Sequence, residues 1–438
     1  MIPTVGIGIL GCGAVGTQVA RILLTEGDEL ARRCGVQFQL RHVVVRNLAA
    51  PRDVALSPGV LSNDPRRIVA DPQTHVVIEL AGGATLAREF ILAALAAGKH
   101  VVTANKALLA LHGREIFAAA RAARTCVAFE AAVAGGIPLI ESVRRGLAAN
   151  RIATIVGILN GTSNFILTRM LENNASYAHA LAEAQRLGYA EADPTLDVEG
   201  IDAAHKLTIL ASLGMRCAVE FGRVATRGIS GIQLGDLTAA DELGYACKLL
   251  AIARQDATGL DLSVQPAFVP KAHPLAAVHG PFNAVSLYGH HVGHTFYFGR
   301  GAGGEPTASA VIADLIDVAL GNAARTAERL AVLPDVCPPP AYRPPGESIS
   351  PFYIRLGLAD QPGGIGRIAT ALGEEAISIA TIVQHEPPQA RAAAAVPVIV
   401  TTHPARERAV RDALEKIARL DLVLERPISI RILDDLTA

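Results

Sequence analysis

The chain has 438 residues, enough for two or three domains. Half of the residues are hydrophobic, only 18% are charged, and the formal net charge is −1. Scattered basic residues and an aromatic content of 4% argue against a nucleic-acid surface, and no apolar run approaches the roughly 20 residues of a membrane helix.

The six cysteines are widely spaced and form no C-x-x-C pair, which favours reduced thiols over a disulfide framework or a zinc site. The N-terminus enters a strand-like run without the charged region and cleavage site of a signal peptide. We therefore expect a cytoplasmic protein.

The first part of the chain alternates between apolar strands and helices. Residues 4–10 predict a buried strand, and a glycine-rich run over 11–16 leads from it into a helix over 17–25. This alternation predicts an α/β fold with a Rossmann-type doubly wound parallel sheet over residues 1–136. The remaining elements expected there are strands over 40–46, 76–80, 100–103 and 126–130 and a helix over 85–97 that ends at Gly98.

The glycine-rich run has the pattern G-x-G-x-x-G in the context that dinucleotide binding requires, after a strand and at the start of a helix. Gly11 permits the tight turn, Gly13 lets a pyrophosphate approach the backbone, and Gly16 allows close packing of helix and strand. Ala14 and Val15 lie at the helix N-terminus, where free N–H groups favour phosphate. We predict dinucleotide binding here, with a structural glycine turn as the alternative.

The second predicted strand ends at Arg46, where an acidic residue would bind the ribose 2′-hydroxyl of NAD. An arginine at this position suits a 2′-phosphate, so NADP is favoured over NAD. A solvated loop arginine is the alternative for Arg46, and NAD remains the alternative cofactor.

Acidic residues gather between Glu191 and Asp202, just before Lys206. Asp202 and Lys206 are four residues apart, so on a helix they share one face. Such a pair can hold a substrate hydroxyl and move its proton. The alternative is a surface ion pair worth a few tenths of a kcal/mol, roughly. The spacing alone leaves both interpretations open.

The second half of the chain changes character three times. Residues 137–304 mix helices and strands, which predicts an α+β domain, and one long helix is expected over 307–332, so that 305–332 would pack back on the first domain. A cluster of prolines over 333–349 predicts a stiff, extended linker. Residues 350–438 have the order β-α-β-β-α-β and predict an independent ferredoxin-like module.

Five further motifs follow one another along the chain: Thr103–Lys106, Glu130–Pro138, Leu159–Asn164, the acidic segment 188–206, and Gly301–Gly304 before Thr307. In their order and spacing, over residues 4 to about 332, they closely resemble the homoserine dehydrogenase family. The segment from 350 resembles an ACT regulatory domain, with 360–365 at its first strand-to-helix turn. The combination is similar to the monofunctional bacterial form that lacks a fused aspartate kinase.

The resemblance implies NAD(P)H-dependent, reversible reduction of L-aspartate 4-semialdehyde to L-homoserine, a step of threonine, methionine and isoleucine biosynthesis. Residues 137–304 would then form the substrate-binding and dimerisation domain. Lys206 matches the catalytic lysine, Asp202 its acidic neighbour, and Lys106 a second lysine beside nicotinamide and substrate. We hypothesise that Lys206 donates the proton and that Asp202 sets its position and pKa. Which lysine transfers the proton stays open.

The same resemblance assigns binding roles to other residues. Glu191 and Asp197 match substrate-binding carboxylates, and Thr103 and Gly303 match cofactor contacts. A monovalent cation site, expected to hold sodium, would be formed by Glu130 with the backbone carbonyls of Val133, Gly135 and Ile137. The alternative for Glu130 is pairing with a backbone amide or a basic residue.

Two other functions are open to this sequence. One is a nucleotide-binding sensor without catalysis, against which the joint presence of Lys106, Glu191, Asp197, Asp202 and Lys206 argues. The other is a dehydrogenase of another small amino-acid semialdehyde. His290, His291 and His294 have metal-ligand spacing, but without a nearby cysteine or acidic cluster we do not expect a metal there.

The expected partners are the small-molecule substrate and further copies of the chain, as a homodimer or homotetramer, with neither nucleic acid nor membrane. An amino-acid effector such as threonine is expected at the ACT domain, and truncation at about residue 340 should abolish its effect and leave the activity. Pro387-Pro388 and the alanines up to Ala395 depart from the ACT pattern, so the effector's identity stays open.

Overall fold

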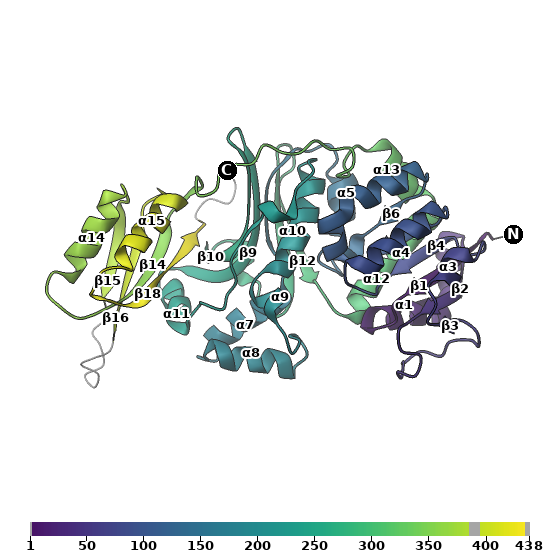
Figure 1. The fold of residues 1–438 in the computed structure, drawn as a ribbon, viewed down its shortest axis with the longest axis horizontal. Helices are drawn as coiled ribbons and strands as arrows, with labels where there is room; N and C mark the ends of the chain where they lie inside the picture. The colour runs from purple at the N-terminus through teal and green to yellow at the C-terminus, as the bar shows by residue number, and fades with distance from the viewer. Residues whose placement is uncertain (1, 385–394, 434–438) are drawn as a thin grey trace.

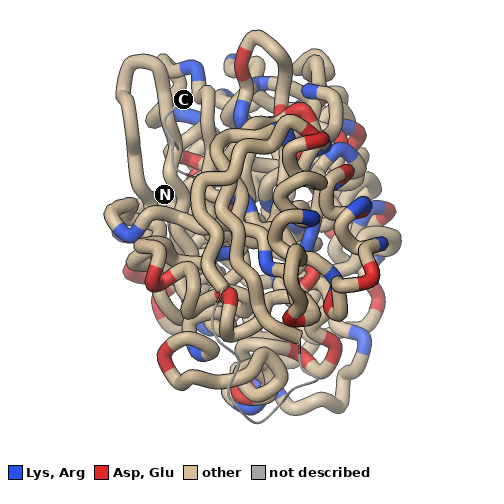
Figure 2. Tube along the Cα trace, turned by 90° about the vertical axis from the view of Figure 1, so that its left-hand side faces the viewer, with Lys and Arg blue, Asp and Glu red and all other residues tan. Residues whose placement is uncertain are grey.

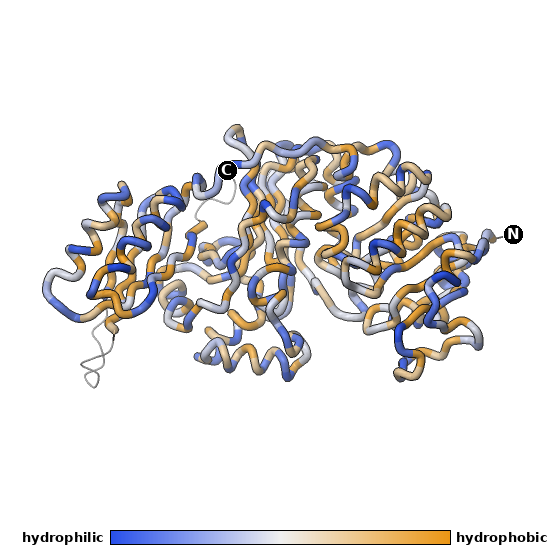
Figure 3. The backbone as a smooth tube through the Cα atoms, in the orientation of Figure 1, coloured by the Kyte–Doolittle hydropathy of each residue, from blue (hydrophilic) through white to orange (hydrophobic). Residues whose placement is uncertain are grey.

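The computed structural model describes residues 2–384 and 395–433. Its three parts follow one another along the longest axis (Figure 1), with the N-terminal domain at one end, a mixed sheet in the centre and a smaller α+β module at the other end. Hydrophobic residues occur throughout all three parts (Figure 3), and the charges of both signs are interspersed on the face shown in Figure 2.

The N-terminal domain is built on six parallel strands in the order β3-β2-β1-β4-β5-β6. The strand order reverses between β1 and β4, and ligands of such sheets bind at the carboxyl ends of the strands beside this point. The predicted doubly wound parallel sheet is confirmed. Its strands are β1 (Thr4–Leu10), β2 (Gln37–Val44), β3 (Leu61–Ser62), β4 (Val76–Glu79), β5 (His100–Thr103) and β6 (Val127–Ala128).

Helices cover both faces of this sheet, which explains why its strands are apolar on both sides. Ile9 and Ile78 pack with α1 and α12 on one face, and Val77 and Val101 pack with α4 and α5 on the other. The helices are α1 (Ala14–Thr25), α2 (Gly27–Cys34), α3 (Arg66–Ala70), α4 (Thr85–Ala96), α5 (Lys106–Ala122) and α12 (Gly304–Ala319).

The expectation of one long helix over 307–332 is wrong. The segment forms α12 and α13 (Asn322–Arg329), which meet at an angle of 78°. Gly321 lies between them with φ +75°, a left-handed conformation that ends helices and favours glycine. Only this bent pair has the length and composition of a membrane span, and no single helix of the described residues does. α12 packs against α1, so the chain returns to its first domain.

The central domain carries five long strands, and its sheet is mostly antiparallel. The strands are β7 (Ile152–Ile158), β9 (Tyr245–Asp256), β10 (Gly259–Pro270), β11 (Phe282–Gly289) and β12 (Gly293–Arg300), and the short β8 (Ala225–Thr226) pairs with β10. Its helices are α6 (Leu139–Glu141), α7 (Gly161–Glu172), α8 (Tyr177–Arg186), α9 (Thr195–Val198), α10 (Ile201–Gly214) and α11 (Leu234–Glu242).

The C-terminal module has the predicted β-α-β-β-α-β order, with its four main strands arranged β18-β14-β16-β15. It is not independent, however, because β18 pairs with β10 and one sheet runs from β12 to β15. The predicted departure at Pro387-Pro388 and the neighbouring alanines lies outside the described residues, except for Ala395. The elements are β13 (Ile349–Ser350), β14 (Phe352–Leu358), α14 (Gly364–Glu374), β15 (Ile379–Gln384), β16 (Val396–Thr402), β17 (Ala405–Arg406), α15 (Glu407–Ile417) and β18 (Val423–Ile432).

The proline-rich segment is tied to the central domain. The Pro338 carbonyl accepts a hydrogen bond from Ala218 N at 2.8 Å, and the Ala341 carbonyl accepts one from Leu260 N at 2.8 Å. Prolines lack an N–H group, but their carbonyls still pair. The segment therefore lies fixed along β10 rather than spanning solvent.

Candidate active site

The glycine-rich loop folds as its sequence predicts. Gly11 has φ +97°, and a Cβ there would lie 2.6 Å from the backbone of Leu80; a Cβ on Gly16 would lie 2.2 Å from the Gly11 carbonyl oxygen. A Cβ on Gly13, which caps α1, would meet nothing within 4 Å. The protein's own packing thus requires Gly11 and Gly16, whereas Gly13 leaves its backbone open to a ligand.

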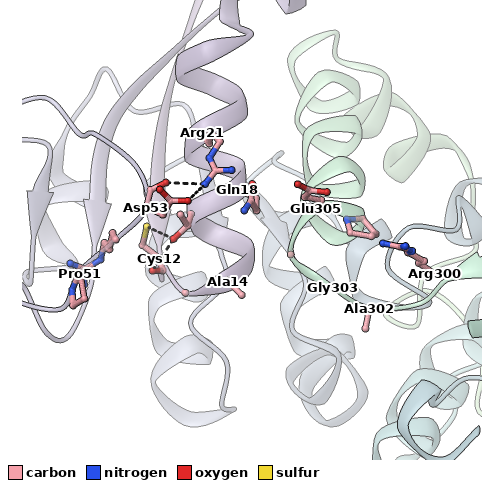
Figure 4. Close-up of a pocket in the computed structure, with 15 residues that line it drawn as sticks. Cys12, Ala14, Gln18, Arg21, Pro51, Asp53, Arg300, Ala302, Gly303 and Glu305 are labelled. Atoms are coloured by element: carbon pink, nitrogen blue, oxygen red, sulfur yellow. Dashed lines mark hydrogen bonds and ion pairs between the residues drawn. The ribbon is translucent and has the colours of Figure 1, made fainter. Parts of the chain in front are cut away.

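A cavity of about 690 Å³ lies between this loop and the segment 300–306. Figure 4 shows Arg21 and Asp53 on one side of it and Arg300 on the other. Both α1 and α12 begin here, and Gly303 caps α12 with φ +118°. Two helix N-termini with free N–H groups suit the phosphates of a dinucleotide, so the residues present fit this cofactor.

The predicted cofactor residues are distributed unevenly around this cavity. Gly13, Ala14 and Gly303 line it, while Gly11, Val15, Gly16 and Thr103 are not among its lining residues. Arg46 is exposed beyond the end of β2 and does not line it either. Arg52 and Asp53 line it instead, and Asp53 forms an ion pair with Arg21. The sequence prediction ended at the strand terminus and missed this loop.

Thr103 is fully buried and holds the end of the sheet together. Its hydroxyl donates to the Glu79 carboxylate at 2.7 Å and accepts from Asn105 N at 3.0 Å. Burial raises the pKa of Glu79, despite hydrogen bonds from Thr103 and from the backbone N–H groups of residues 81 and 82. Asn105 then caps α5 by accepting from Leu108 N at 3.1 Å. This chain of contacts places Lys106 at the start of α5.

Asp202 stands between the two predicted catalytic lysines. The Lys206 Nζ donates to one carboxylate oxygen at 2.7 Å, and the Lys106 Nζ lies 3.3 Å from the other. The side chains of Asp202 and Lys206 are 9% and 10% exposed, and that of Lys106 is 41% exposed. The interpretation of Asp202 and Lys206 as a surface ion pair is therefore wrong. Lys206 also donates to the Leu159 carbonyl at 2.8 Å.

Asn160 joins the acids of the site. Its Nδ2 donates to Asp197 at 2.7 Å and to Asp202 at 2.9 Å, and its Oδ1 caps α7 by accepting from Ser163 N at 2.8 Å. Asn160 lies in the motif Leu159–Asn164, and its contacts with the two acids were not predicted from the sequence. The side-chain amide between an apolar strand and a helix, typical of an N-cap, was the available signal.

The pKa values of Asp197 and Asp202 are shifted in opposite directions. Burial, and then the charge of Asp202, raise the pKa of Asp197. Burial would also raise the pKa of Asp202, but Lys206 and Lys106 outweigh it and lower this pKa to about 2. Asp202 is therefore a permanent anion that holds two cations together. Such a buried, charge-balanced cluster is typical of proton-transfer sites.

Two residues of the acidic segment make no hydrogen bond to this cluster in the described part of the chain. The Glu191 side chain is exposed, and only its backbone carbonyl is bonded, to Gln185 Nε2 at 3.1 Å. His205 stacks on Phe221 at 4.5 Å between ring centroids, and burial lowers its pKa. His205 is thus a neutral packing residue beside Lys206.

Glu130 is buried, and both of its carboxylate oxygens accept backbone N–H groups, from Ile140 and Glu141 at 2.8 Å each. The alternative of backbone pairing is therefore present in the structure. Burial raises the pKa of Glu130 and also that of Asp314, which accepts from the Glu130 N–H at 2.8 Å. The following turn, with Val133, Gly135 and Ile137, contains left-handed φ angles at Ala134 (57°) and Gly135 (39°).

The histidines of the central hairpin bond to that hairpin and its neighbour. His290 Nδ1 accepts from Arg151 N at 2.9 Å, and His294 Nε2 lies 3.0 Å from Ser286 Oγ. No group of three or more His, Cys, Asp or Glu side chains that could hold a metal ion occurs in the described part of the chain.

The doubly wound domain and the buried lysine–carboxylate cluster indicate an NAD(P)-dependent oxidoreductase. Comparison with protein families makes this specific. The homoserine dehydrogenase model matches residues 138–316, the model of its NAD-binding domain matches 11–130, and an ACT-domain model matches 352–419. The chain belongs to the homoserine dehydrogenase family, and it carries an ACT domain.

Individual relatives agree along the whole chain. A homoserine dehydrogenase of Pseudomonas aeruginosa is 44% identical over 98% of either chain, and one of Bacillus subtilis is 38% identical over 96% of either. A solved homoserine dehydrogenase from Thiobacillus denitrificans has a TM-score of 0.91 at 45% identity and covers 99% of both chains. A hyperthermophilic archaeal homoserine dehydrogenase in complex with NADPH has a TM-score of 0.60 at 25% identity, covering 72% of this chain and 98% of its own.

Proposed function

We propose that this homoserine dehydrogenase interconverts L-aspartate 4-semialdehyde and L-homoserine at the cluster of Lys206, Asp202 and Lys106, and that NADP is its preferred cofactor. The contact of one buried carboxylate with both lysines carries the catalytic assignment. A bound nicotinamide supplies or accepts the hydride; the protein supplies the proton and the binding groups.

Reduction of an aldehyde leaves developing negative charge on oxygen, which needs a proton donor aimed at it. Lys206 donates one N–H to Asp202 and one to the Leu159 carbonyl. Its third N–H makes no hydrogen bond to the described residues and is available to a substrate oxygen. Asp202 keeps the lysine in place through this ion pair. Lys106, which is half-exposed, would polarise the same oxygen or relay the proton.

The substrate ammonium group needs acidic partners. Asp197 lies in the cluster and shares Asn160 with Asp202, so it can hold a cation beside the reacting centre. Glu191 is proposed as the second acid on the family resemblance. It lies in the exposed segment between α8 and α9, six residues before Asp197.

The replacement Lys206→Ala tests the catalytic assignment. We expect kcat to fall by roughly 10² to 10⁴, as for the loss of a general acid, while the Kd for NADPH stays unchanged. NADPH oxidation followed with aspartate semialdehyde gives kcat, and NADPH fluorescence gives Kd. Lys271→Ala is the control, because among the described residues its ion pair is with the half-exposed Asp241 alone. Normal turnover in Lys206→Ala would contradict the assignment and move the proton donor to Lys106.

The open space at Gly13 gives a test of the cofactor site. Gly13→Ala adds a Cβ that meets no protein atom within 4 Å, so the fold should persist. The new methyl group would occupy the approach of the pyrophosphate, and we expect the Kd for NADPH to rise at least about tenfold. Unchanged NADPH fluorescence titrations would argue against pyrophosphate binding at this loop.

The ratio of NADPH to NADH affinity in Arg46→Ala and Arg52→Ala identifies which arginine binds the 2′-phosphate.

We further propose a monovalent cation, sodium, bound by Glu130 and the carbonyls of Val133, Gly135 and Ile137. Two adjacent buried acids, Glu130 and Asp314, support it, because a cation would offset their desolvation. The midpoint of thermal unfolding should then rise with NaCl more than with choline chloride, and equal midpoints would count against the site.

Regulation, assembly and location complete the proposal. The ACT domain supports feedback control by an amino acid such as threonine, and we expect a homodimer or homotetramer, to be distinguished by sedimentation equilibrium. All six cysteines are free thiols, which is typical of the cytoplasm. Oxidation of Cys12 or Cys34 in the protein purified from cells would argue against that location.

A further inference from the structure

Asn283 is a buried polar side chain of the central domain that lies outside the sequence motifs described above. It stands near the start of β11, is 1% exposed, and is paired with Gly299 of β12. Its Nδ2 donates a hydrogen bond to the Leu159 carbonyl at 3.1 Å. Leu159 directly follows β7, which pairs with β11 on the other side, so this contact joins two neighbouring strands where they reach the active site.

The Leu159 carbonyl is also an acceptor of Lys206. Its oxygen receives the Lys206 Nζ at 2.8 Å and the Asn283 Nδ2 at 3.1 Å, so both of its lone pairs are used. Lys206 donates a second N–H to Asp202 at 2.7 Å. With two N–H groups held, tetrahedral geometry fixes the direction of the third, which is the one available to a substrate oxygen. With Asp202 alone, the ammonium group could turn about a single hydrogen bond.

Asn283 is itself packed against the segment that leads to the dinucleotide cavity. A Cβ on Gly301 would lie 2.1 Å from the Asn283 Cγ, and the three atoms nearest to that Cβ all belong to the Asn283 carboxamide. The residues that follow Gly301 line the cavity up to the start of α12. One side chain therefore contacts both the segment beside the cofactor site and the carbonyl that holds Lys206.

We propose that Asn283 is a positioning residue: it orients the Leu159 carbonyl, and through that carbonyl it aims the third N–H of Lys206. Its packing on Gly301 ties this aim to the position of the segment 301–304 beside the cofactor. The inference rests on the proposed role of Lys206 as the proton donor. A misplacement of a reacting group by about 1 Å can cost on the order of 10²-fold in rate.

Asn283→Ala tests the proposal, because it leaves the Leu159 carbonyl with Lys206 as its remaining donor. We expect kcat to fall about 10- to 100-fold, while the KM for aspartate semialdehyde and the Kd for NADPH stay within about twofold. Steady-state kinetics give kcat and KM, and NADPH fluorescence gives Kd. The solvent deuterium isotope effect on kcat should rise, because transfer of the Lys206 proton becomes slower relative to the other steps.

Asn150→Ala is the matched control. The Asn150 side chain also holds backbone groups of the β11–β12 hairpin, accepting from Val292 N at 2.9 Å, but at the opposite end from Asn283. Its loss should leave kcat and the isotope effect at their wild-type values. Asn283→Leu has nearly the shape of asparagine and also lacks the donor, so it should reproduce the kinetics of Asn283→Ala if the alanine variant does not fold. Circular dichroism shows which variants are folded.

Gly301→Ala perturbs the same contact from the side of the cofactor segment. Gly301 does not have a left-handed φ, so alanine fits the backbone, and its Cβ would displace the Asn283 carboxamide. We expect kcat to fall. In the presence of Asn283→Ala, however, Gly301→Ala should lower kcat by less than about twofold further, because the carboxamide is then absent. Effects that multiply would overturn the link between the two residues.

The outcomes separate this inference from the proposed function. Normal turnover in Asn283→Ala, with Lys206→Ala inactive, would overturn the positioning role and leave the proton donor assigned. A fall in kcat with matching rises in KM and Kd, or with an unchanged solvent isotope effect, would show a general loosening of the site and would also overturn it. Normal turnover in Lys206→Ala would instead remove the proposed function on which the inference rests.

Discussion

Burial sets the charge state of Lys248, at the start of β9. The residue is 3% exposed and donates to the Val278 carbonyl at 2.5 Å and to Asn164 of α7 at 3.4 Å. Burial lowers its pKa to about 8, although Cys247 and Glu172 act in the opposite direction. The folded protein therefore loses this proton before the unfolded chain does.

Lys248 should make stability rise with pH in an alkaline window. Between about pH 8 and 10.5 the unfolded state binds more protons at this site, so the Lys248 contribution to the free energy of unfolding should increase by up to about 3 kcal/mol. The buried thiols of Cys126, Cys217 and Cys247, whose pKa values are raised, contribute in the opposite direction, so the prediction concerns the difference between wild type and variant. Lys248→Met should remove this rise, whereas Lys271→Met, at a half-exposed ion pair, should keep it. Urea unfolding at several pH values measures both. Parallel pH profiles for wild type and Lys248→Met would contradict the prediction.

At the scale of single residues, contacts between residues close together in the sequence were predictable, whereas contacts between residues far apart in the sequence were not. Asp202 and Lys206 are four apart, and helical geometry alone puts them on one face. Asn160 lies 42 residues from Asp202, and Arg52 lines the cavity beside the glycine-rich loop through a segment without a repeating pattern. Contacts of that kind depend on tertiary structure, which local periodicity does not describe.

At the scale of elements, the strands of the first domain were predictable because a parallel sheet covered on both faces requires continuous apolar runs. The break between α12 and α13 was not, because helical periodicity continues through Leu320 and Gly321. A glycine inside a helical pattern is ambiguous: it can be tolerated or can end the helix. In this structure Gly321 has a left-handed φ, and the helix ends there.

Gly321→Ala should destabilise the protein by about 1 kcal/mol, because alanine is strained at a positive φ. A Cβ there would meet nothing within 4 Å, so no collision contributes. Gly366→Ala is the matched substitution, in the first turn of α14 and equally free of neighbours, and it should stabilise by up to about 1 kcal/mol. Thermal unfolding should shift in opposite directions for the two variants. Equal shifts would contradict the conformational explanation.

At the scale of the molecule, the ACT module and the central domain share a buried charge network. Asp236 is fully buried on α11 and binds Arg355 and Tyr353 of β14, and Tyr353 packs on Phe268 of β10 at 4.9 Å. The expectation of an intact enzyme after truncation at residue 340 therefore needs revision. Truncation removes both partners of Asp236 and the strand that covers the edge of β10.

Removing one partner of this network should lower the free energy of unfolding more than removing both. Arg355→Met leaves the Asp236 carboxylate buried without a counter-charge, which we expect to cost about 3 to 5 kcal/mol. Adding Asp236→Asn should recover part of that loss, giving a coupling of about 1 to 3 kcal/mol in a double-mutant cycle. Chemical unfolding of the four proteins measures it. Additive effects would show that the two domains are not coupled through this pair.

The pairing of β18 with β10 has a consequence for synthesis. Ala267 and Phe268 of β10 pair with Arg431 and Ile432, and Leu433 N donates to the Phe268 carbonyl at 2.9 Å. During synthesis β10 leaves the ribosome long before β18. The edge of β10 that pairs with β18 therefore stays unpaired while the linker and most of the ACT module are translated. Open sheet edges recruit other chains. A chain that ends before β18 therefore keeps an unpaired, aggregation-prone edge on β10, which pairing with β18 would cover.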